Sequence, residues 1–261
     1  MSKILLSIIS IFIPLLANAD GEALIPEGNF MMGCSKGDTA CYKDESQQGG
    51  VSVFVPTFYI DNYEVTVSDY KRCAEVGKCR IPEPEFCNYV AKDHDKHPMN
   101  CVKWQDAHDY CTFVGKRLPY EAEWEKAARG GTSSPYPWGS AASCKEAIIN
   151  DGRTTGSVKG VLDGCGEDGT FPVGSRQANS FGLFDIHGNV VEWVENWYDP
   201  EALISIYAKG DLKGPNSGNK RVARGGSWDD KAPNLRSSFR DARPVTQWGG
   251  SLGFRCARDG K

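Results

Sequence analysis

The chain has 261 residues, of which 40% are hydrophobic, 11% are aromatic and 25% are charged. This composition is typical of a globular protein and excludes a disordered or collagen-like chain. The 30 basic and 34 acidic residues give a formal charge of −4 without a long basic run, which argues against a nucleic-acid-binding surface.

The first 19 residues have the pattern of a secretory signal peptide. Lys3 supplies a positive charge, residues 4–16 form an apolar run, and Ala17 and Ala19 are the small residues that a signal peptidase recognises. We predict cleavage after Ala19; the alternative is an uncleaved anchor. No cysteine adjoins this site, so a lipid anchor is not expected, and the protein would be periplasmic or secreted.

The mature chain, residues 20–261, is predicted to form one domain. No later apolar run approaches the roughly 18 residues that a membrane-spanning helix needs, so no membrane span is expected there. Strand-like sequence flanks Pro56 within residues 51–60. Three short helices are predicted in residues 66–75, 105–114 and 121–129, the last ended by Gly130 and Gly131. The predicted fold class is therefore α+β with a high coil content.

A long stretch from residue 130 into the 180s is rich in Gly, Asp, Ser and Asn and has no clear period. Such a stretch inside a compact domain is usually functional, or it is held by disulfides or ions. We therefore looked for residues that would order it.

Ten cysteines in an exported chain indicate disulfides. Proximity in the sequence suggests the pairs Cys34–Cys41, Cys73–Cys79, Cys87–Cys101 and Cys144–Cys165, which leaves Cys111 with Cys256. Sequence alone does not fix this connectivity. The alternative is a metal cluster of Cys87, His94, His97 and Cys101, although that spacing matches no common zinc pattern.

Several motifs make the chain resemble the formylglycine-generating enzyme, or sulfatase-modifying factor, family. Residues 117–125 read RLPYEAEWE, residues 188–193 read GNVVEW, and residues 224–228 read RGGSW. Further matching segments occupy residues 25–33, 58–66, 97–104, 136–139 and 252–257. The resemblance covers almost all of the mature chain, and it implies a single C-type-lectin-like α+β domain with little regular structure. It also implies the pairing of Cys111 with Cys256.

Calcium is the first cofactor that the resemblance implies. Calcium prefers oxygen ligands from carboxylates, amides and carbonyls. Similar enzymes bind it at positions that match two sets of residues here, and the ions would be structural. The alternative is that these acids only cap turns. The first set is Asn150, Asp151, Asp168 and Thr170; the second is Asp185, Gly188, Val190 and Glu192.

Copper is the second cofactor that the resemblance implies, and at its site the sequence departs from the family. Oxidative members hold copper(I) with a cysteine pair just after the Gly-Gly-Ser-aromatic segment. Residues 229–235 contain no cysteine, and Asp229 and Asp230 are hard ligands that bind copper(I) weakly. We therefore predict that copper-dependent formylglycine generation is absent, and whether the protein is an enzyme is left open.

Three hypotheses follow. The protein could bind an unknown protein or small-molecule ligand in a groove, as lectin-like domains do. It could be another oxidoreductase, similar to the branch that matures the siderophore pyoverdine, or it could modify sulfatases by another mechanism. The candidate groove residues are Ser227, Trp228, Asp229, Asp230, Arg236, Arg240 and Trp248.

Overall fold

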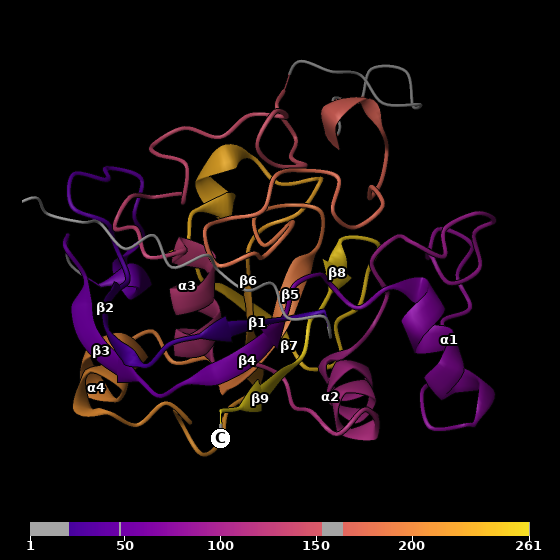
Figure 1. Ribbon diagram of the computed structural model, residues 1–261, viewed down its shortest axis with the longest axis horizontal. Helices are drawn as coiled ribbons and strands as arrows, with labels where there is room; N and C mark the ends of the chain where they lie inside the picture. Colours follow the sequence, from indigo (N-terminus) through magenta and orange to yellow (C-terminus); the bar gives the residue numbers. More distant parts are fainter. Residues whose placement is uncertain (1–20, 47, 153–163, 261) are drawn as a thin grey trace, which may run out of the picture.

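The protein is described by a computed structural model that covers residues 21–46, 48–152 and 164–260. The predicted signal peptide, residues 1–19, therefore lies outside the described residues. Among the described residues, none of the helices has the length and apolar character needed to cross a bilayer. Helices and strands alternate with long irregular segments, so the predicted coil-rich α+β class is confirmed (Figure 1).

Three helices coincide with the predicted segments. They are α1 (Val67–Glu75), α2 (Trp104–Phe113) and α3 (Glu121–Arg129), and a one-turn helix α4 (Ala202–Ser205) comes later. The Thr66 side chain caps α1 by accepting a hydrogen bond from the Asp69 backbone N–H at 3.1 Å. Gly130 ends α3 in the left-handed conformation that glycine adopts at low cost, with φ of 56°.

Two small antiparallel sheets are built from the first strands and the last. In the first, β4 (Phe58–Asp61) lies between β1 (Glu22–Ile25) and β9 (Ala257–Asp259), so the two ends of the described chain are adjacent. In the second, β2 (Gly28–Met32) pairs with β3 (Val51–Val55). The strand character predicted on both sides of Pro56 is thus confirmed as β3 and β4.

A third sheet has the order β7–β6–β5–β8. Its strands are β5 (Val191–Trp197), β6 (Lys220–Arg224), β7 (Asp241–Pro244) and the short β8 (Leu252–Gly253). The β5–β8 pair is parallel and the other pairs are antiparallel. Elsewhere in the described chain, one-turn 3-10 helices lie at Lys43–Glu45, Gly164–Gly166, Tyr207–Lys209 and Ala232–Leu235.

Helix α3 lies at the centre of the molecule, between the β2–β3 ribbon on one side and α1 and α2 on the other (Figure 1). All nine of its residues are buried, including Glu121, Glu125 and Arg129. Trp124 of α3 packs in one hydrophobic core with strands β1 to β4, while Tyr70, Tyr110 and Trp193 belong to a second core shared by α1, α2 and β5.

The four disulfides that proximity in the sequence suggested and the fifth, Cys111–Cys256, are all present, and every cysteine of the chain belongs to one of them. Cys111 of α2 is joined to Cys256 across 145 residues of sequence. The alternative metal cluster is excluded, because Cys87 and Cys101 are bonded to each other. Five disulfides are consistent with an extracellular protein.

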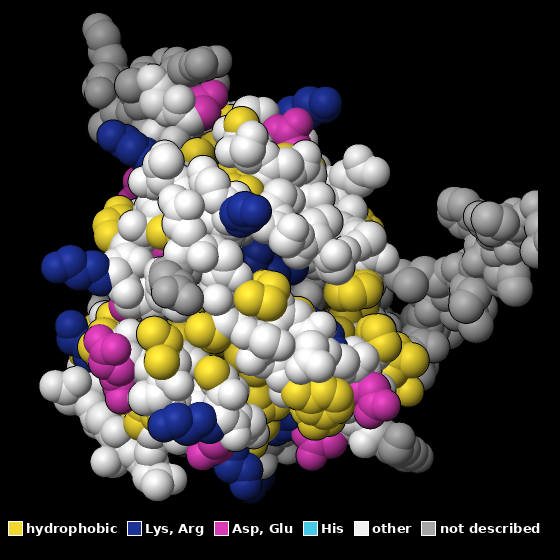
Figure 2. Space-filling model, turned by 90° about the vertical axis from the view of Figure 1, so that its left-hand side faces the viewer, with side chains coloured by type: hydrophobic (Ala, Val, Ile, Leu, Met, Phe, Trp, Pro, Cys, Tyr) yellow, Lys and Arg dark blue, Asp and Glu magenta, His cyan; other side chains and the backbone are white. Residues whose placement is uncertain are grey.

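The face that carries β2, β3 and α4 has no continuous hydrophobic surface. Its exposed hydrophobic residues include Met31, Phe54 and Ile204. In the space-filling view of this side, hydrophobic side chains are interrupted by charged and polar ones (Figure 2). Exposed hydrophobic residues that are dispersed in this way are normal on protein surfaces and indicate no docking site.

Candidate functional site

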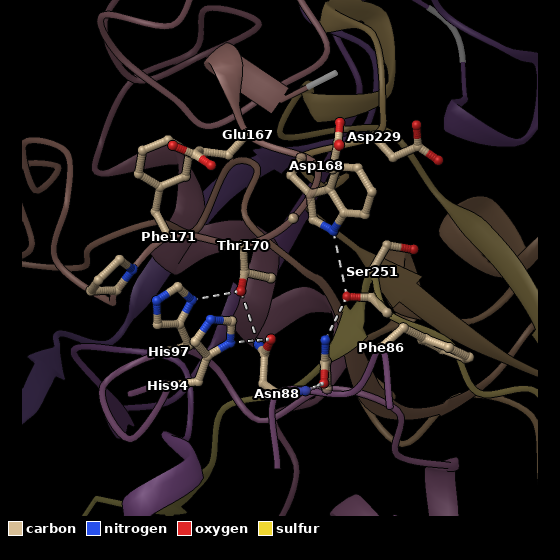
Figure 3. Close-up of a pocket in the computed structure, with 15 residues that line it drawn as sticks. Phe86, Asn88, His94, His97, Glu167, Asp168, Thr170, Phe171, Asp229 and Ser251 are labelled. Atoms are coloured by element: carbon tan, nitrogen blue, oxygen red, sulfur yellow. Dashed lines mark hydrogen bonds between the residues drawn. The ribbon is translucent and has the colours of Figure 1, made fainter. Parts of the chain in front are cut away.

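A cavity of about 800 Å³ opens between four irregular segments (Figure 3). Its lining comes from the loops between α1 and α2, from residues 167–172, from Trp228 and Asp229, and from Gly250 and Ser251 just before β8. At least 20 residues of sequence separate each of these segments from the next, so the site exists only in the folded chain. Its volume is typical of cavities that hold a small molecule or a side chain of a partner.

Asn88 organises the floor of the cavity. Its Nδ2 donates to the Pro98 carbonyl at 2.8 Å and to Thr170 Oγ1 at 2.9 Å. Its backbone N–H donates to Asn100 Oδ1 at 2.8 Å, and Asn100 Nδ2 donates to the Gly250 carbonyl at 2.8 Å. These bonds join the loop of residues 88–100 to Thr170 and to Gly250, so the polar floor is held in place by the protein's own contacts.

Two stacked histidines form one side of the floor. The rings of His94 and His97 are nearly parallel, with 4.0 Å between their centroids. His94 Nδ1 lies 3.1 Å from Asn88 Oδ1, and His97 Nδ1 lies 2.9 Å from Thr170 Oγ1. Burial and the neighbouring His94 lower the pKa of His97 to about 4, so His97 is neutral at physiological pH.

Aromatic rings form much of the wall. Trp228, Phe86 and Phe171 all line the cavity. The indole N–H of Trp228 points to the Gly250 carbonyl at 3.4 Å. Phe86 stacks on Trp248 with 6.0 Å between ring centroids, so Trp248 adjoins the cavity through Phe86. The wall therefore presents apolar ring surface above a polar floor.

Three carboxylates, those of Glu167, Asp168 and Asp229, also line the cavity, whereas no lysine or arginine of the described segments does. Figure 3 shows them on the side of the cavity opposite the two histidines. Glu167 and Asp229 are exposed at the rim. Because His97 is neutral, it does not offset the charge of these carboxylates, and the described lining is negative in charge.

The seven groove residues predicted from the sequence fall into three places. Trp228 and Asp229 line the cavity, and Trp248 adjoins it. Ser227 and Asp230 form the turn beneath Trp228, with the Ser227 hydroxyl donating to Asp230 Oδ2 at 2.7 Å. Asp230 therefore holds the loop that carries the two cavity residues.

The other two groove candidates, Arg236 and Arg240, do not line the cavity. The guanidinium of Arg236 pairs with buried Glu45 at 2.5 and 2.7 Å. That of Arg240 pairs with buried Glu121 at 2.6 and 2.9 Å. Both arginines are themselves buried, and Arg236 also donates to the Pro233 carbonyl of the loop at 2.9 Å.

The first predicted calcium set is divided between two cavities. Asp168 and Thr170 line the cavity described above, whereas Asn150 and Asp151 line a smaller one beside Lys231 and Pro233. The Asn150 backbone N–H donates to the Asp230 carbonyl at 2.9 Å, and its Oδ1 accepts from the Gly152 N–H at 3.0 Å. These contacts are those of a capped turn, and calcium at this set stays a prediction.

The second predicted calcium set lies around a buried group of acids. Asp185 Oδ1 is buried without a hydrogen-bond partner. Burial raises the pKa of Asp185 to about 6, and burial together with Asp185 and Glu192 raises the pKa of Glu64 well above its ordinary value. Arg255 pairs with Glu192 at 2.7 Å but leaves the three acids with an excess of negative charge.

A hard divalent cation would offset that charge and take the unpaired Asp185 oxygen, so Asp185 and the carbonyls of Gly188 and Val190 fit calcium in charge and donor type. Glu192 fits less well, because both of its oxygens already accept hydrogen bonds from Arg255 and Trp124. Among the described residues, no three His, Cys, Asp or Glu side chains are grouped to hold a metal, so carbonyls would have to complete this set.

Copper(I) does not fit the cavity. Its preferred ligands are thiolates, and every sulfur of the ten cysteines is in a disulfide. The Cys144–Cys165 disulfide packs in a small core with Ala232 and Leu235 of the loop after Trp228.

Sequence reasoning did not single out the cavity floor. His94 and His97 were considered only as zinc ligands, and Asn88 and Asn100 were not considered. Their common signal is weak: they are polar residues in a loop held by the Cys87–Cys101 disulfide, and polar loop residues are usually solvated. What makes them a site is their approach to Thr170 and Gly250 from distant parts of the chain.

The chain was then compared with known proteins. A family model described as "Sulfatase-modifying factor enzyme 1-like domain" matches residues 14–260. A formylglycine-generating enzyme of Thermomonospora curvata is 37% identical, over 92% of this chain and 94% of that protein. A mouse protein named inactive C-alpha-formylglycine-generating enzyme 2 is 37% identical, over 61% of this chain and 48% of its own length.

Among solved structures, that of PvdO from Pseudomonas aeruginosa superposes with a TM-score of 0.73. It is 25% identical in sequence, and the match covers 92% of this chain and 94% of PvdO. The match of both whole chains shows that the fold of this protein is that of a single family domain.

Proposed function

The chain belongs to the sulfatase-modifying factor family that includes the formylglycine-generating enzymes, and on that premise we propose that it is an exported member without copper-dependent oxidase activity. Its role would be to bind a ligand in the cavity lined by Trp228 and Asp229, either as a receptor or in the maturation of that ligand.

One observation carries the loss of copper chemistry. All ten cysteines are paired in five disulfides. Asp229 and Asp230 follow Trp228 in the segment where the oxidative members have their copper-binding cysteines. Asp229 is exposed at the rim, and Asp230 is engaged by Ser227 and Asn234. Carboxylates are hard ligands, so neither residue substitutes for a thiolate towards copper(I). The relatives of this chain also include a mouse protein that is named as inactive.

The cavity supports the binding role. Its floor is ordered by hydrogen bonds among Asn88, Asn100 and Thr170, and its walls present the rings of Trp228 and Phe86. A polar floor with fixed donors and acceptors beneath aromatic walls is the usual composition of a ligand site.

Calcium in the second set would have a structural role. Its carboxylates lie beneath the turn between Asp185 and Glu192, which leads into β5 and so positions the loops around the cavity. A cation there would offset the charge of these acids, since burial raises the pKa of both Glu64 and Asp185 and repulsion among the acids adds to the shift.

Metal analysis and oxygen uptake on the purified mature protein test the proposal together. We expect no stoichiometric copper or iron, with or without added copper(I), and no oxygen consumption with a thiol peptide. The Thermomonospora curvata relative serves as the positive control for both assays. Stoichiometric copper(I) together with oxygen uptake at a rate comparable to that control would refute the proposal.

The second candidate is an oxidoreductase of another type, and the Cys144–Cys165 disulfide is the observation that favours it. Both cysteines are half-buried, and the disulfide packs against Ala232 and Leu235 of the loop that follows Trp228. If it were opened, two thiols would lie next to that loop. The likeness to PvdO also keeps this candidate open.

The double variant C144A/C165A separates the two candidates. A binding protein keeps its affinity for the cavity ligand when this disulfide is removed, provided that it remains folded. An oxidase that uses the pair loses oxygen uptake completely, whereas the matched variant C73A/C79A keeps it. Mass spectrometry of the mature N-terminus tests export, and the expected first residue is Asp20.

A further inference from the structure

The hydrogen-bond donors of the cavity floor are already used within the protein. Both donor hydrogens of Asn88 Nδ2 go to the Pro98 carbonyl and to Thr170 Oγ1. Asn100 Nδ2 and the indole N–H of Trp228 both point to the Gly250 carbonyl, at 2.8 and 3.4 Å. A ligand therefore finds few free donors on these residues.

The tautomer of His94 adds an acceptor. Asn88 Nδ2 faces a carbonyl, which fixes the orientation of the amide and makes Oδ1 the atom that faces His94. A carbonyl oxygen only accepts, so Nδ1 of His94 carries a proton, and in the tautomer with one ring proton the lone pair is on Nε2. Its Nε2 is then a lone-pair acceptor on a ring that lines the cavity.

Carboxylates supply further acceptors and the charge. Glu167 and Asp229 line the cavity, and neither forms an ion pair with a lysine or arginine in the described part of the chain. Among the described residues, no lysine or arginine lines the cavity. The lining is thus rich in acceptors and negative in charge, and the complementary ligand has N–H donors and positive charge.

The aromatic walls suit the same ligand. Organic cations bind favourably over aromatic faces, and tryptophan is the best of these. Trp228 and Phe86 offer such faces, and Phe86 is backed by Trp248. The protein's own Arg176 already makes this contact nearby, with its guanidinium 5.2 Å from the centroid of the Phe171 ring.

Building on the binding role proposed above, we propose that the cavity recognises an organic cation: an ammonium, amidinium or guanidinium group attached to an apolar or aromatic body. The charged group lies between the carboxylates of Asp229 and Glu167 and the ring of Trp228. Its N–H groups donate to these carboxylates, while the apolar body contacts Phe86, and His94 Nε2 is a further acceptor on the opposite side of the cavity. Such a group could belong to a free amine or to a basic side chain of a peptide.

A series of three probes of the same shape tests this proposal. Benzamidine, benzamide and benzoate share the phenyl ring and carry positive, zero and negative charge. Calorimetric titration should give benzamidine an affinity about tenfold higher than that of benzamide, with benzoate weaker still. Added salt should weaken benzamidine and leave benzamide unchanged.

Variants at the rim identify the charges responsible. The double variant D229N/E167Q should lower the benzamidine affinity about three- to tenfold without changing that of benzamide. Both residues are exposed, so the variant should fold, and its melting curve checks this. The matched control is Glu201→Gln, an exposed acid at the start of α4 that does not line the cavity.

The source of the cation is resolved by comparing methylguanidine with a blocked Gly-Arg-Gly peptide. Tighter binding of the peptide assigns the group to a polypeptide, and equal binding assigns it to a free amine or guanidine; both support the proposal. Equal affinity for benzamidine and benzamide, or no saturable binding of benzamidine, overturns it. These binding measurements do not report on copper content or oxygen uptake. The loss of oxidase activity is therefore tested separately, by the metal and oxygen assays above.

Discussion

Buried and cavity-lining acids have opposite surroundings in this protein. In the scaffold around α3, each buried acid faces an arginine: Glu121 pairs with Arg240, and Glu125 pairs with both Arg129 and Arg224. At the cavity, Glu167 and Asp229 have no such partner among the described residues. Charges that hold the fold together are neutralised within the protein, whereas the charges at the cavity are left to interact with something else.

The acids near β5 are an intermediate case. Glu64, Asp185 and Glu192 are buried as in the scaffold, but Arg255 ion-pairs directly only with Glu192. They share the burial of the first group and the charge imbalance of the second. The structural calcium proposed above would offset this imbalance and would act in folding, not in ligand binding.

The largest effect should come from the disulfide that joins the scaffold to the end of the chain. Removing Cys111–Cys256 with C111A/C256A should cost about 5 kcal/mol in the chain-entropy model, because it opens a loop of 145 residues. The control C34A/C41A opens a loop of 7 residues and should cost about 2 kcal/mol. Urea denaturation measures both, and equal losses would show that loop length is not the deciding factor.

The second largest loss of stability should come from breaking a buried ion pair of the scaffold. Glu121→Gln leaves the guanidinium of Arg240 buried without its bidentate partner, which should cost about 3–5 kcal/mol. The control Glu201→Gln is exposed and should change the free energy of unfolding by less than about 0.5 kcal/mol. A loss at Glu121 as small as that of the control would contradict the scaffold role.

The acids near β5 should give stability an unusual pH dependence. The pKa of Asp185 is raised from 3.8 to about 6, so the folded state binds its proton more tightly than the unfolded state does. This contribution is therefore full below about pH 4 and is lost as the pH rises through about 6, by roughly 2–3 kcal/mol.

Buried His187 gives the free energy of unfolding the opposite pH dependence, over much of the same pH range. Burial lowers its pKa to about 4, so its neutral form stabilises the fold above about pH 6.5, and this stability is lost as the pH falls towards 4. Comparing the protein with Asp185→Asn isolates the Asp185 contribution. The variant should gain stability relative to the parent between pH 4 and 7, and calcium should abolish that difference if it binds there. A pH-independent difference would mean that Asp185 does not titrate in this range.

The smallest effect on stability should be at the cavity. Asp229→Asn should change the free energy of unfolding by less than about 0.5 kcal/mol, because its carboxylate is exposed and makes no ion pair with the described residues. The same variant should weaken cation binding. A large loss of stability would place Asp229 in the scaffold and remove the distinction between the two groups of acids.

Local features were predictable because short-range chemistry determines them. The Thr66 cap and the Gly130 stop define two helix ends, and four of the disulfides join cysteines that are close in sequence. The Cys111–Cys256 pair followed only once the local pairs were assumed and the family resemblance was recognised.

The candidate site was predictable only in part. The polarity of the loop after Trp228 drew attention to Asp229, which does line the cavity. The same reasoning included Arg236 and Arg240, because an arginine near a polar loop looks exposed in sequence. Their partners Glu45 and Glu121 are about 120 to 190 residues away, so no local pattern indicates that they are buried.

Sequence by itself determined the family, the short helices, the pairing of neighbouring cysteines and the missing thiols after Trp228. Those properties depend on residue identity and on contacts within a few turns of chain. Tertiary structure alone decided which acids meet an arginine and which face an open cavity. The interaction between two charges depends on their distance and burial in space, and both are fixed only when remote loops such as those of Asn88 and Thr170 come together.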